Sequence, residues 1–284
     1  MGNNKPFFNR TRLLLGDRLM ESLDKTRVII FGVGGVGSWC AEGLVRSGIG
    51  HLTIVDSDRV CITNVNRQMM ATSKTIGMVK VEALKERLEE INPDVEIEAV
   101  QAIYSEETAS QFDLDTYDYV IDAIDSLKDK ATLILKATAS KSKFFSSMGA
   151  ALKLDPTKVE VSEFWKVKGC PLARALRQRF KKKKEYPQKK FLCVYSDELI
   201  ENKGKESSCG TDRCVCPKTS NGAGDPSLAN HEWCSSKARI NGSLMHITSI
   251  FGLTLSGLVL KDINLRVLKA ENDGNKAQND KMRN

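Results

Sequence analysis

A glycine-rich turn between a short apolar run and a helical pattern constrains the fold of this chain more than any other feature. Val28–Phe31 is a run of apolar residues, and Gly32, Gly34 and Gly37 follow it with the spacing G-x-G-x-x-G. Apolar residues then recur at 36, 40 and 44, as in an amphipathic helix. Glycines at such a junction let the backbone approach a phosphate, which the free N–H groups of the helix N-terminus attract. The pattern predicts a strand, a nucleotide-binding turn and a helix.

The first half of the chain continues as an alternation of strands and helices. Further strand patterns lie at 52–55, 95–100, 119–121 and 144–148, and helical patterns lie at 81–91 and 129–141. Strands that alternate with helices are typical of a mostly parallel sheet. We therefore expect an α/β, Rossmann-like fold with helices on both faces of the sheet.

The second half departs from this alternation. Two strand patterns, 159–161 and 191–195, flank a basic amphipathic segment at 171–184, and 201–232 is rich in loop-forming residues. We therefore expect additional strands and a basic insertion in this half. The predicted organisation is a Rossmann-like nucleotide-binding half at 1–155, a basic and loop-rich substrate region at 156–241, a helix at 242–269 that packs on the core, and a disordered tail at 270–284.

Charge is unevenly distributed between the halves. Residues 1–150 hold 18 Lys and Arg against 21 Asp and Glu, a net charge of −3, whereas residues 151–284 hold 25 against 15, a net charge of +10. The second half is therefore a candidate surface for a polyanion. Seven of its cations fall within eleven residues: Arg174, Arg177, Arg179, Lys181, Lys182, Lys183 and Lys184. Such a stripe can neutralise RNA phosphates, but it is also typical of a solvated surface.

The composition favours a cytoplasmic protein without membrane contact. The first twelve residues are polar and basic and lack the apolar region of a secretory signal. The longest apolar stretch, Leu244–Leu260, is interrupted by polar residues and falls short of the roughly 20 apolar residues that span a bilayer. Eight cysteines in a chain without such a signal indicate reduced thiols.

An acidic residue and two cations follow the second predicted strand in a set order. Asp56 comes directly after that strand, where an acid commonly accepts from ribose hydroxyls. These features alone fit a nicotinamide or flavin site as well as an ATP site. Arg67 and Lys80 favour ATP, because a triphosphate needs cations and a dehydrogenase has no need of a basic pair here. Asp125 follows another strand and suits a magnesium ion that is shared with the phosphates.

Five motifs in this order resemble the adenylation domain of the MoeB/ThiF/HesA superfamily, which is related to ubiquitin-activating enzymes. They are Gly32-Val-Gly-Gly-Val-Gly-Ser38, Ile54-Val-Asp-Ser-Asp58, Asn64-Val-Asn-Arg-Gln68, Gly77-Met-Val-Lys80 and Asp122-Ala-Ile-Asp125. The resemblance implies an ATP site formed by Gly32, Gly34, Gly35, Gly37, Asp56, Asn64, Arg67, Gln68, Lys80, Asp125 and Ser126. It implies catalytic roles for Arg10, Arg67, Lys80 and Asp125, with Asp125 beside a Mg²⁺ ion.

The segment Phe8-Asn9-Arg10 resembles the amino-terminal motif of the same superfamily. The arginine of that motif reaches into the ATP site of the neighbouring subunit. The resemblance therefore implies a homodimer in which Arg10 acts in trans, with Arg12 as a nearby competitor for the role.

Within that superfamily, the second half resembles the tRNA threonylcarbamoyladenosine dehydratases (TcdA, also called CsdL). The matching segments are Asp155-Pro-Thr-Lys-Val-Glu-Val161, Pro171-Leu-Ala-Arg-Ala-Leu-Arg177 and Cys193-Val-Tyr-Ser-Asp-Glu198. The resemblance implies an enzyme that uses ATP to activate the threonyl carboxylate of N6-threonylcarbamoyladenosine beside the tRNA anticodon and to cyclise it. Together with the charge asymmetry, it favours tRNA binding by the seven cations at 174–184 over a merely solvated surface. The alternative is an adenylating enzyme for a ubiquitin-like sulfur-carrier protein, but the two C-x-x-C pairs common in those relatives are absent.

The cysteines leave a metal or sulfur-transfer role open. Cys209, Cys214, Cys216 and Cys234 could form a four-thiolate zinc site, but C-x-C is a poor spacing for zinc, so we expect thiols without a metal. Cys193 and Cys234 lie in segments that resemble cysteine-bearing segments of the dehydratases. A sulfur-transfer protein is therefore a further candidate partner.

Overall fold

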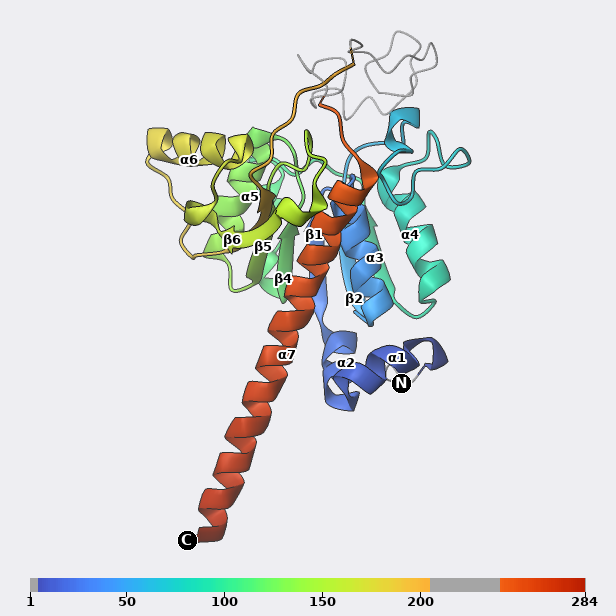
Figure 1. The fold of residues 1–284 in the computed structure, drawn as a ribbon. Helices are drawn as coiled ribbons and strands as arrows, with labels where there is room; N and C mark the ends of the chain where they lie inside the picture. The colour runs from blue at the N-terminus through green and yellow to red at the C-terminus, as the bar shows by residue number, and fades with distance from the viewer. Residues whose placement is uncertain (1–4, 205–240, 284) are drawn as a thin grey trace.

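The computed structural model describes residues 5–204 and 241–283, without the side chains of 274–283. Seven strands form one sheet in the order β3-β2-β1-β4-β5-β7-β6 (Figure 1). The strands are β1 (Arg27–Phe31), β2 (His51–Val55), β3 (Glu96–Val100), β4 (Tyr119–Asp122), β5 (Lys143–Ser147), β6 (Val159–Glu163) and β7 (Leu192–Ser196). The α-helices are α1 (Asn9–Leu15), α2 (Asp17–Lys25), α3 (Gly37–Ser47), α4 (Lys80–Ile91), α5 (Leu127–Ala139), α6 (Pro171–Lys183) and α7 (Met245–Arg283).

The sheet is parallel except at one edge, where β6 runs antiparallel to β7. Both faces of β1 are buried. Val28 and Ile30 belong to a core that includes residues of α3 and α7, whereas Ile29 and Phe31 belong to a second core that includes residues of α5 and α6. A strand covered on both faces is apolar throughout, which explains the uninterrupted run in the sequence. The predicted α/β fold with helices on both faces is confirmed.

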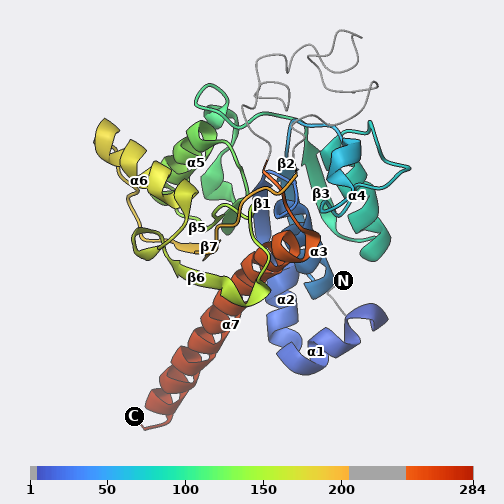
Figure 2. The ribbon, with the colours of Figure 1, turned by 45° about the horizontal axis from the view of Figure 1, so that its top comes forward.

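The second half of the chain extends the same sheet. The strand β7 pairs with β5 in parallel, and β6 then forms the edge. The basic segment predicted at 171–184 is helix α6, which packs beside α5 on the side of the sheet away from α4 (Figures 1 and 2). The basic insertion is therefore a helix fixed to the sheet by its apolar face.

The helices α1 and α2 precede the sheet and were not predicted. The buried side chains Leu19, Met20 and Leu23 of α2 join the core shared with α3 and α7. Both helices lie at the edge of the sheet where β1 begins (Figure 1). The segment 9–25 is rich in charged residues, and only the buried stripe of α2 carries a helical signal.

The last helix differs from its expected bounds. We predicted a helix at 242–269 and a disordered tail at 270–284, but α7 begins at Met245 and continues to Arg283. The extension projects beyond the sheet in Figures 1 and 2. Adding residues to an existing helix avoids the cost of nucleation, and Ala, Glu, Lys and Gln in this segment are good helix formers. In the described residues 5–204 and 241–283, no helix has both the length and the apolar character of a bilayer-spanning segment.

A polar cluster anchors α7 to the sheet. The Tyr119 hydroxyl donates to Asp262 Oδ2 at 2.8 Å, and Arg266 Nη2 lies 2.8 Å from the same oxygen. The Arg266 guanidinium also covers the Tyr119 ring at 4.8 Å, and Lys143 Nζ lies 3.3 Å from Asp262 Oδ1. Burial alone would raise the pKa of Asp262, but the hydrogen bonds from Tyr119 and Arg266 and the nearby charge of Lys143 lower it.

We expect Asp262→Asn to lower the free energy of unfolding by about 1–3 kcal/mol at neutral pH, because it removes a charged acceptor from three donors. A carboxyl with a lowered folded-state pKa stabilises the protein above its unfolded pKa of about 3.9, and the stabilisation is lost as the pH falls through the folded value. The difference in the free energy of unfolding between variant and wild type should therefore become smaller at acidic pH. Urea unfolding at pH 7 and pH 3 measures both values.

The matched control is Glu271→Gln, also on α7, which removes the exposed pair between Glu271 and Arg18 of α2. We expect its free energy of unfolding to change by about 0–1 kcal/mol, as for other surface pairs. An equal loss in both variants would contradict an anchoring role for Asp262.

Candidate active site

The candidate site lies at the carboxyl ends of β1, β2 and β4. The strand β1 has β2 on one side and β4 on the other, so the chain leaves β1 in one direction and later returns to its opposite side. Crossover connections diverge at such a switch point and leave a crevice for a ligand. The glycine-rich turn begins at this point, directly after β1.

Two glycines of the turn are required by close backbone contacts. Gly32 has a φ of +84°, and a Cβ at that position would lie 2.8 Å from the carbonyl oxygen of Ala123. A Cβ on Gly37 would lie 1.9 Å from the carbonyl oxygen of Gly32. A larger residue at Gly32 would therefore force the turn away from the segment after β4, and one at Gly37 would clash with the turn itself. The turn leads into α3, which begins at Gly37, so the positive end of the helix dipole lies at this edge of the sheet.

Asp56 connects the end of β2 to the glycine turn. Its Oδ2 atom accepts from the Val33 N–H at 2.8 Å, and its Oδ1 atom accepts from the Asp58 N–H at 2.9 Å. Burial raises the pKa of Asp56, while the charge of Lys80 opposes the shift. The carboxylate lies beside the turn, as a ribose-binding acid would, and keeps lone pairs for further donors.

The segment 62–69 folds over the start of α3. The Trp39 indole Nε1 donates to the Arg67 carbonyl at 3.0 Å, and the Met69 N–H donates to Ser38 Oγ at 3.2 Å. A Cβ built on Gly35 would lie 3.3 Å from Arg67 Cγ. Arg67 therefore lies against the glycine turn, although it is distant from the turn in sequence.

The Arg67 side chain is partly held by its own segment. Its Nη1 atom donates to the Thr63 carbonyl and to Asn66 Oδ1, both at 2.9 Å. Burial lowers the pKa of Arg67, and the charge of Asp125 opposes that shift. A guanidinium has five N–H donors, so these contacts orient it and leave donors for a phosphate.

Lys80 brings the second cation to the same place. Its side chain is 6% exposed, and Nζ lies 2.7 Å from Asp58 Oδ2. Burial would lower the pKa of Lys80, but the charges of Asp58, Asp56 and Asp125 raise it. Arg67 and Lys80 thus both interact with the Asp125 carboxylate, which places the predicted cations and acids of the site in one neighbourhood.

Gln68 and Asn64 are buried side chains near the start of α3. Gln68 is 6% exposed, and among the described residues its Oε1 atom is buried without a hydrogen-bond partner. Its Nε2 atom would lie 3.7 Å from a Cβ on Gly34. A buried amide oxygen without a partner is costly, and here the protein itself encloses the atom. The Asn64 Oδ1 atom accepts from the Cys61 N–H, which leaves its Nδ2 atom for a ligand.

The site suits a magnesium ion only together with phosphates. Within residues 5–204 and 241–283, no three His, Cys, Asp or Glu side chains are grouped so that they could hold a metal. Mg²⁺ commonly takes one or two carboxylates and completes its shell with water and substrate phosphates. The exposed Asp125 carboxylate fits that mode, because its charge acts on both Arg67 and Lys80, the cations that would hold the triphosphate.

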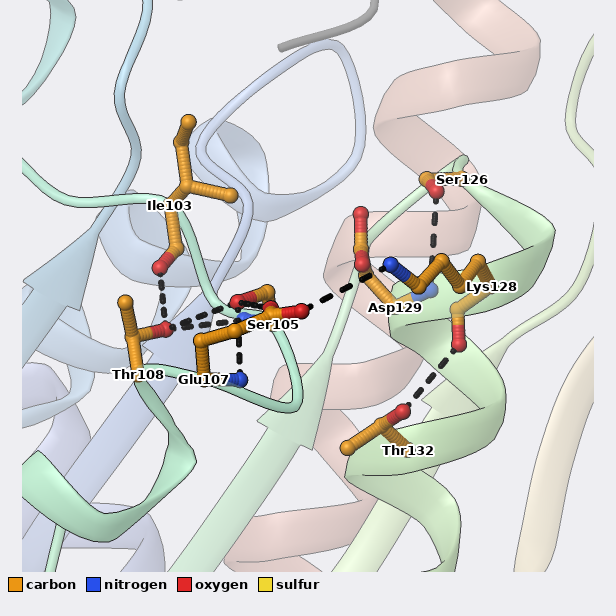
Figure 3. Close-up of polar contacts among 8 residues, drawn as sticks. All are labelled: Ile103, Ser105, Glu107, Thr108, Ser126, Lys128, Asp129 and Thr132. Carbon is orange, nitrogen blue, oxygen red and sulfur yellow. Dashed lines mark hydrogen bonds and ion pairs between the residues drawn. The ribbon is translucent and has the colours of Figure 1, made fainter. Parts of the chain in front are cut away.

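Ser126 acts as the N-cap of α5, beside Asp125. Its Oγ atom accepts from the Asp129 N–H at 3.5 Å, as Figure 3 shows. Lys128 in the same turn of α5 lies 3.9 Å from Glu107 Oε1, which ties α5 to the loop after β3. The Ser126 hydroxyl therefore has a structural role in the cap in addition to its predicted place in the ATP site.

A model of the ThiF family matches residues 8–276. The chain belongs to the ThiF family. Among its relatives, the tRNA threonylcarbamoyladenosine dehydratase of Bacillus subtilis is 39% identical over 268 residues, which cover 92% of this chain and 98% of the relative. The Escherichia coli protein of the same name is 36% identical over 198 residues, which cover 68% of this chain and 74% of the relative.

A solved structure agrees with these sequence matches. The crystal structure of the Escherichia coli tRNA N6-threonylcarbamoyladenosine dehydratase in complex with ATP has a TM-score of 0.75 and 29% identity, and the match covers 92% of this chain and 95% of that chain. The family resemblance inferred from five motifs is thereby confirmed, as is the closer resemblance to the dehydratases.

Arg10 lies apart from the other predicted site residues of this ThiF-family chain. It is an exposed residue of α1, which lies at the edge of the sheet where β1 begins (Figure 1). The glycine turn lies at the opposite edge, where β1 ends. Arg10 is therefore the one predicted catalytic residue that this chain does not bring to its own crevice.

The basic residues of α6 divide into two groups. Ala173, Leu176 and Phe180 fix one side of the helix in the core, whereas Arg174, Lys181–Lys183 and the C-cap residue Lys184 are exposed and Arg179 is half-buried. Arg177 is partly buried, donates to the Phe164 carbonyl at 3.0 Å and lies over the Phe164 ring. Arg177 thus has a structural role, and the exposed cations form the surface open to a polyanion.

The cysteines in the described part of the chain are free thiols. Cys193 is 0% exposed, and burial raises its pKa well above the ordinary value. A buried, protonated thiol is a poor nucleophile, which argues against sulfur transfer through Cys193 in this conformation. Cys209, Cys214, Cys216 and Cys234 lie outside the described residues.

The sequence interpretation missed three contributors to the site. Asp58 pairs with Lys80, Thr248 of α7 lies 3.2 Å from a Cβ built on Gly35, and Lys130 is buried behind Asp125. Asp58 follows Asp56 by two residues and could have been noticed as a second acid after β2. Thr248 and Lys130 have no local signal, because only the packing of α7 and α5 brings them there.

Proposed function

We propose that the protein uses ATP to cyclise N6-threonylcarbamoyladenosine beside the anticodon of tRNA, with loss of water. The carrying observation is that Arg67, Lys80, Asp56 and Asp125 gather around the glycine turn at the switch point of the sheet. This arrangement fits a nucleoside triphosphate better than a dinucleotide, because it places two cations beside the phosphate-binding turn. The relatives named as dehydratases support the choice of substrate.

The proposed reaction begins with activation of the threonyl carboxylate. A carboxylate oxygen attacks the α-phosphorus of ATP, pyrophosphate leaves, and the acyl-adenylate forms. Arg67 and Lys80 stabilise the negative charge that develops on the departing pyrophosphate. A magnesium ion held by Asp125 and the phosphates would neutralise part of the same charge.

Ring closure follows within the substrate. A nucleophilic atom of the threonylcarbamoyl group attacks the activated acyl carbon, and AMP leaves with the former carboxylate oxygen. The step is intramolecular and gains from proximity, so no cysteine nucleophile is required. The overall change removes one water from the nucleoside and converts ATP to AMP and pyrophosphate.

The direct test supplies purified protein with ATP, Mg²⁺ and tRNA that carries N6-threonylcarbamoyladenosine. Digestion of the tRNA and mass spectrometry should reveal a nucleoside lighter by one water, together with AMP and pyrophosphate. If the products were ADP and phosphate, the activated intermediate would be an acyl phosphate and not an acyl-adenylate. An unchanged nucleoside, with adenylation of a ubiquitin-like sulfur carrier in a parallel reaction, would instead favour the carrier-activating alternative.

We propose that tRNA binds the exposed cations of α6. Arg174 and Lys181–Lys184 are exposed, and the aromatic side chains Trp165 and Tyr186 are exposed beside them, with ring centroids 6.3 Å apart. Cations can neutralise the phosphates while aromatic rings stack on unpaired bases. The net charge of +10 in this half of the chain supports the same placement.

Replacing Lys181, Lys182 and Lys183 together by glutamine should weaken tRNA binding about tenfold or more. It should also reduce the slope of log K against log salt by up to about 0.7–0.9 for each phosphate that the variant no longer neutralises. Fluorescence anisotropy at several salt concentrations measures both quantities. The control variant replaces Lys25, Lys261 and Lys269, which are exposed on α2 and α7, by glutamine. Equal weakening in both variants would indicate a general charge effect and contradict a site on α6.

We propose that the active form is a homodimer in which Arg10 reaches the ATP site of the second copy. Arg10 lies at the wrong edge of the sheet for its own crevice, which supports action in trans. Leu13 and Leu14 of the same helix are 80% and 83% exposed, a pair of apolar side chains suited to a protein partner. We place this dimer in the cytoplasm, where the free thiols Cys40, Cys61, Cys170 and Cys193 would stay reduced.

Mixing two inactive variants tests action in trans. We expect Arg10→Ala and Arg67→Ala each to be nearly inactive alone. After unfolding and refolding of an equal mixture, half of the dimers are mixed and each has one intact site, so about a quarter of wild-type activity should return. If Arg10 acts within its own chain, every site keeps one defect and no activity returns.

A further inference from the structure

A fully buried ion pair lies directly behind the segment that carries Asp125. The pair joins Asp122, at the end of β4, to Lys130 of α5, with 2.8 Å between Oδ2 and Nζ. Both side chains are 0% exposed. The Ser146 hydroxyl, on the neighbouring strand β5, donates to the same Asp122 oxygen at 2.6 Å. The pair is therefore enclosed between the sheet and α5.

Both ends of this pair also hold the peptide groups of Ile124. The Lys130 ammonium donates to the Ile124 carbonyl at 2.8 Å, and Asp122 Oδ1 accepts from the Ile124 N–H at 3.1 Å. The carbonyl of Ile124 belongs to the peptide bond that leads into Asp125. Lys130 thus fixes the backbone on the amino-terminal side of Asp125, while the Ser126 cap holds the other side (Figure 3).

A stabilising role alone does not account for this arrangement. Two charges lose their hydration on burial, and an apolar pair of similar volume is often as stable or more so. Here the ammonium makes a hydrogen bond to a backbone carbonyl of the site as well as its ion pair. A buried lysine can reach that carbonyl from a rigid helix, whereas an apolar side chain could not hold it.

We propose that Lys130 is a positioning residue that holds Asp125 at the phosphate edge of the site. This inference rests on the role of Asp125 in the proposed function. Lys130 contacts neither ATP nor the reacting carboxylate; it acts through the Ile124 carbonyl. Its loss should leave the glycine turn and the two cations in place but release the backbone before Asp125.

The test compares three variants with wild type. Lys130→Met removes the ammonium, Asp122→Asn with Lys130→Met removes both charges, and Ser146→Ala removes a hydrogen bond to Asp122 without touching Ile124. Each is measured for melting temperature, for kcat in tRNA cyclisation at saturating ATP, and for the Mg²⁺ concentration that gives half-maximal activity.

For Lys130→Met we expect a lower melting temperature and a kcat reduced between about tenfold and a hundredfold, as for a small misplacement of a catalytic group. The half-maximal Mg²⁺ concentration should rise. The double variant should regain much of the melting temperature, since no unpaired charge is buried, but its kcat should stay low because Ile124 still lacks its donor. Ser146→Ala should keep near wild-type kcat.

Two results would overturn the proposal. One is a double variant that regains kcat together with its melting temperature, since the pair would then matter only for stability. The other is an unchanged kcat and Mg²⁺ dependence in Lys130→Met at a temperature where it is folded. Wild-type protein that fails to cyclise the tRNA would refute the proposed function instead. In that case, ATP binding by wild type and by Lys130→Met would be measured at several Mg²⁺ concentrations, and an equal Mg²⁺ dependence would overturn the positioning role.

Discussion

Lys80→Met is expected to reduce ATP-dependent cyclisation by about 10²–10³-fold in kcat, because it removes a preorganised cation from the departing pyrophosphate. Methionine keeps most of the side-chain length and can be buried without cost to packing. Nζ of Lys80 is already held by Asp58 at 2.7 Å, so little reorganisation is needed when the charge of the leaving group develops. The rate of pyrophosphate release in single-turnover experiments measures the effect.

The fall in kcat should be larger than a partial loss of folded protein would cause. Removing Lys80 leaves Asp58 and Asp56 without their cation, so the variant should unfold somewhat more easily and needs a check by circular dichroism. The matched control is Lys85→Met on the same helix, because Lys85 pairs with Glu89 at 3.8 Å on the surface. If the Lys80 variant kept wild-type kcat while folded, the phosphate role of this side chain would be wrong.

Arg67→Ala should lower kcat/KM by about 10²–10³-fold, and Arg67→Lys should restore only a part of that loss. Lysine returns the positive charge but not the planar fork, which can hold two phosphate oxygens at once. The bonds of Arg67 Nη1 to the Thr63 carbonyl and Asn66 would also be lost, so the fork would no longer be oriented. Steady-state kinetics with ATP varied at saturating tRNA separates KM from kcat.

Arg46→Ala provides the control for this change. Arg46 is an exposed arginine on α3 that pairs with Glu42, and Glu42 keeps Arg87 as a second partner. We expect its kcat/KM to match wild type. Full recovery of kcat/KM in Arg67→Lys would show that charge alone is needed and would contradict bidentate binding.

The two cations are positioned by different structural elements, so substitutions elsewhere in the chain should affect the position of each side chain differently. Lys80 is the first residue of α4 and is fixed by the helix. Arg67 belongs to an irregular segment that depends on Trp39 and Ser38 of α3 for its position. Changes in that segment should therefore affect Arg67 more than Lys80. The spacing of the two cations along the chain does not reveal this difference.

The fold class and the order of the site residues could be predicted from the amino-acid sequence. Local patterns sufficed for these, because a buried strand, a glycine turn and an amphipathic helix each have a short-range signal. Asp56 and Asp125 could be placed at one edge because the carboxyl ends of parallel strands share an edge. The end of α7 was harder to predict, since its extension beyond residue 269 carries no apolar stripe.

Contacts between side chains of different elements could not be predicted, because they depend on how the elements pack in space. The burial of Lys130 against Asp122, the contact of Thr248 with the glycine turn and the structural role of Arg177 join residues that are far apart in the chain or lie on separate elements. The remoteness of Arg10 from its own crevice is also a property of the fold. Helical and strand periodicity specify which face of an element is buried, but not which partner covers it, because that depends on the packing of every element at once.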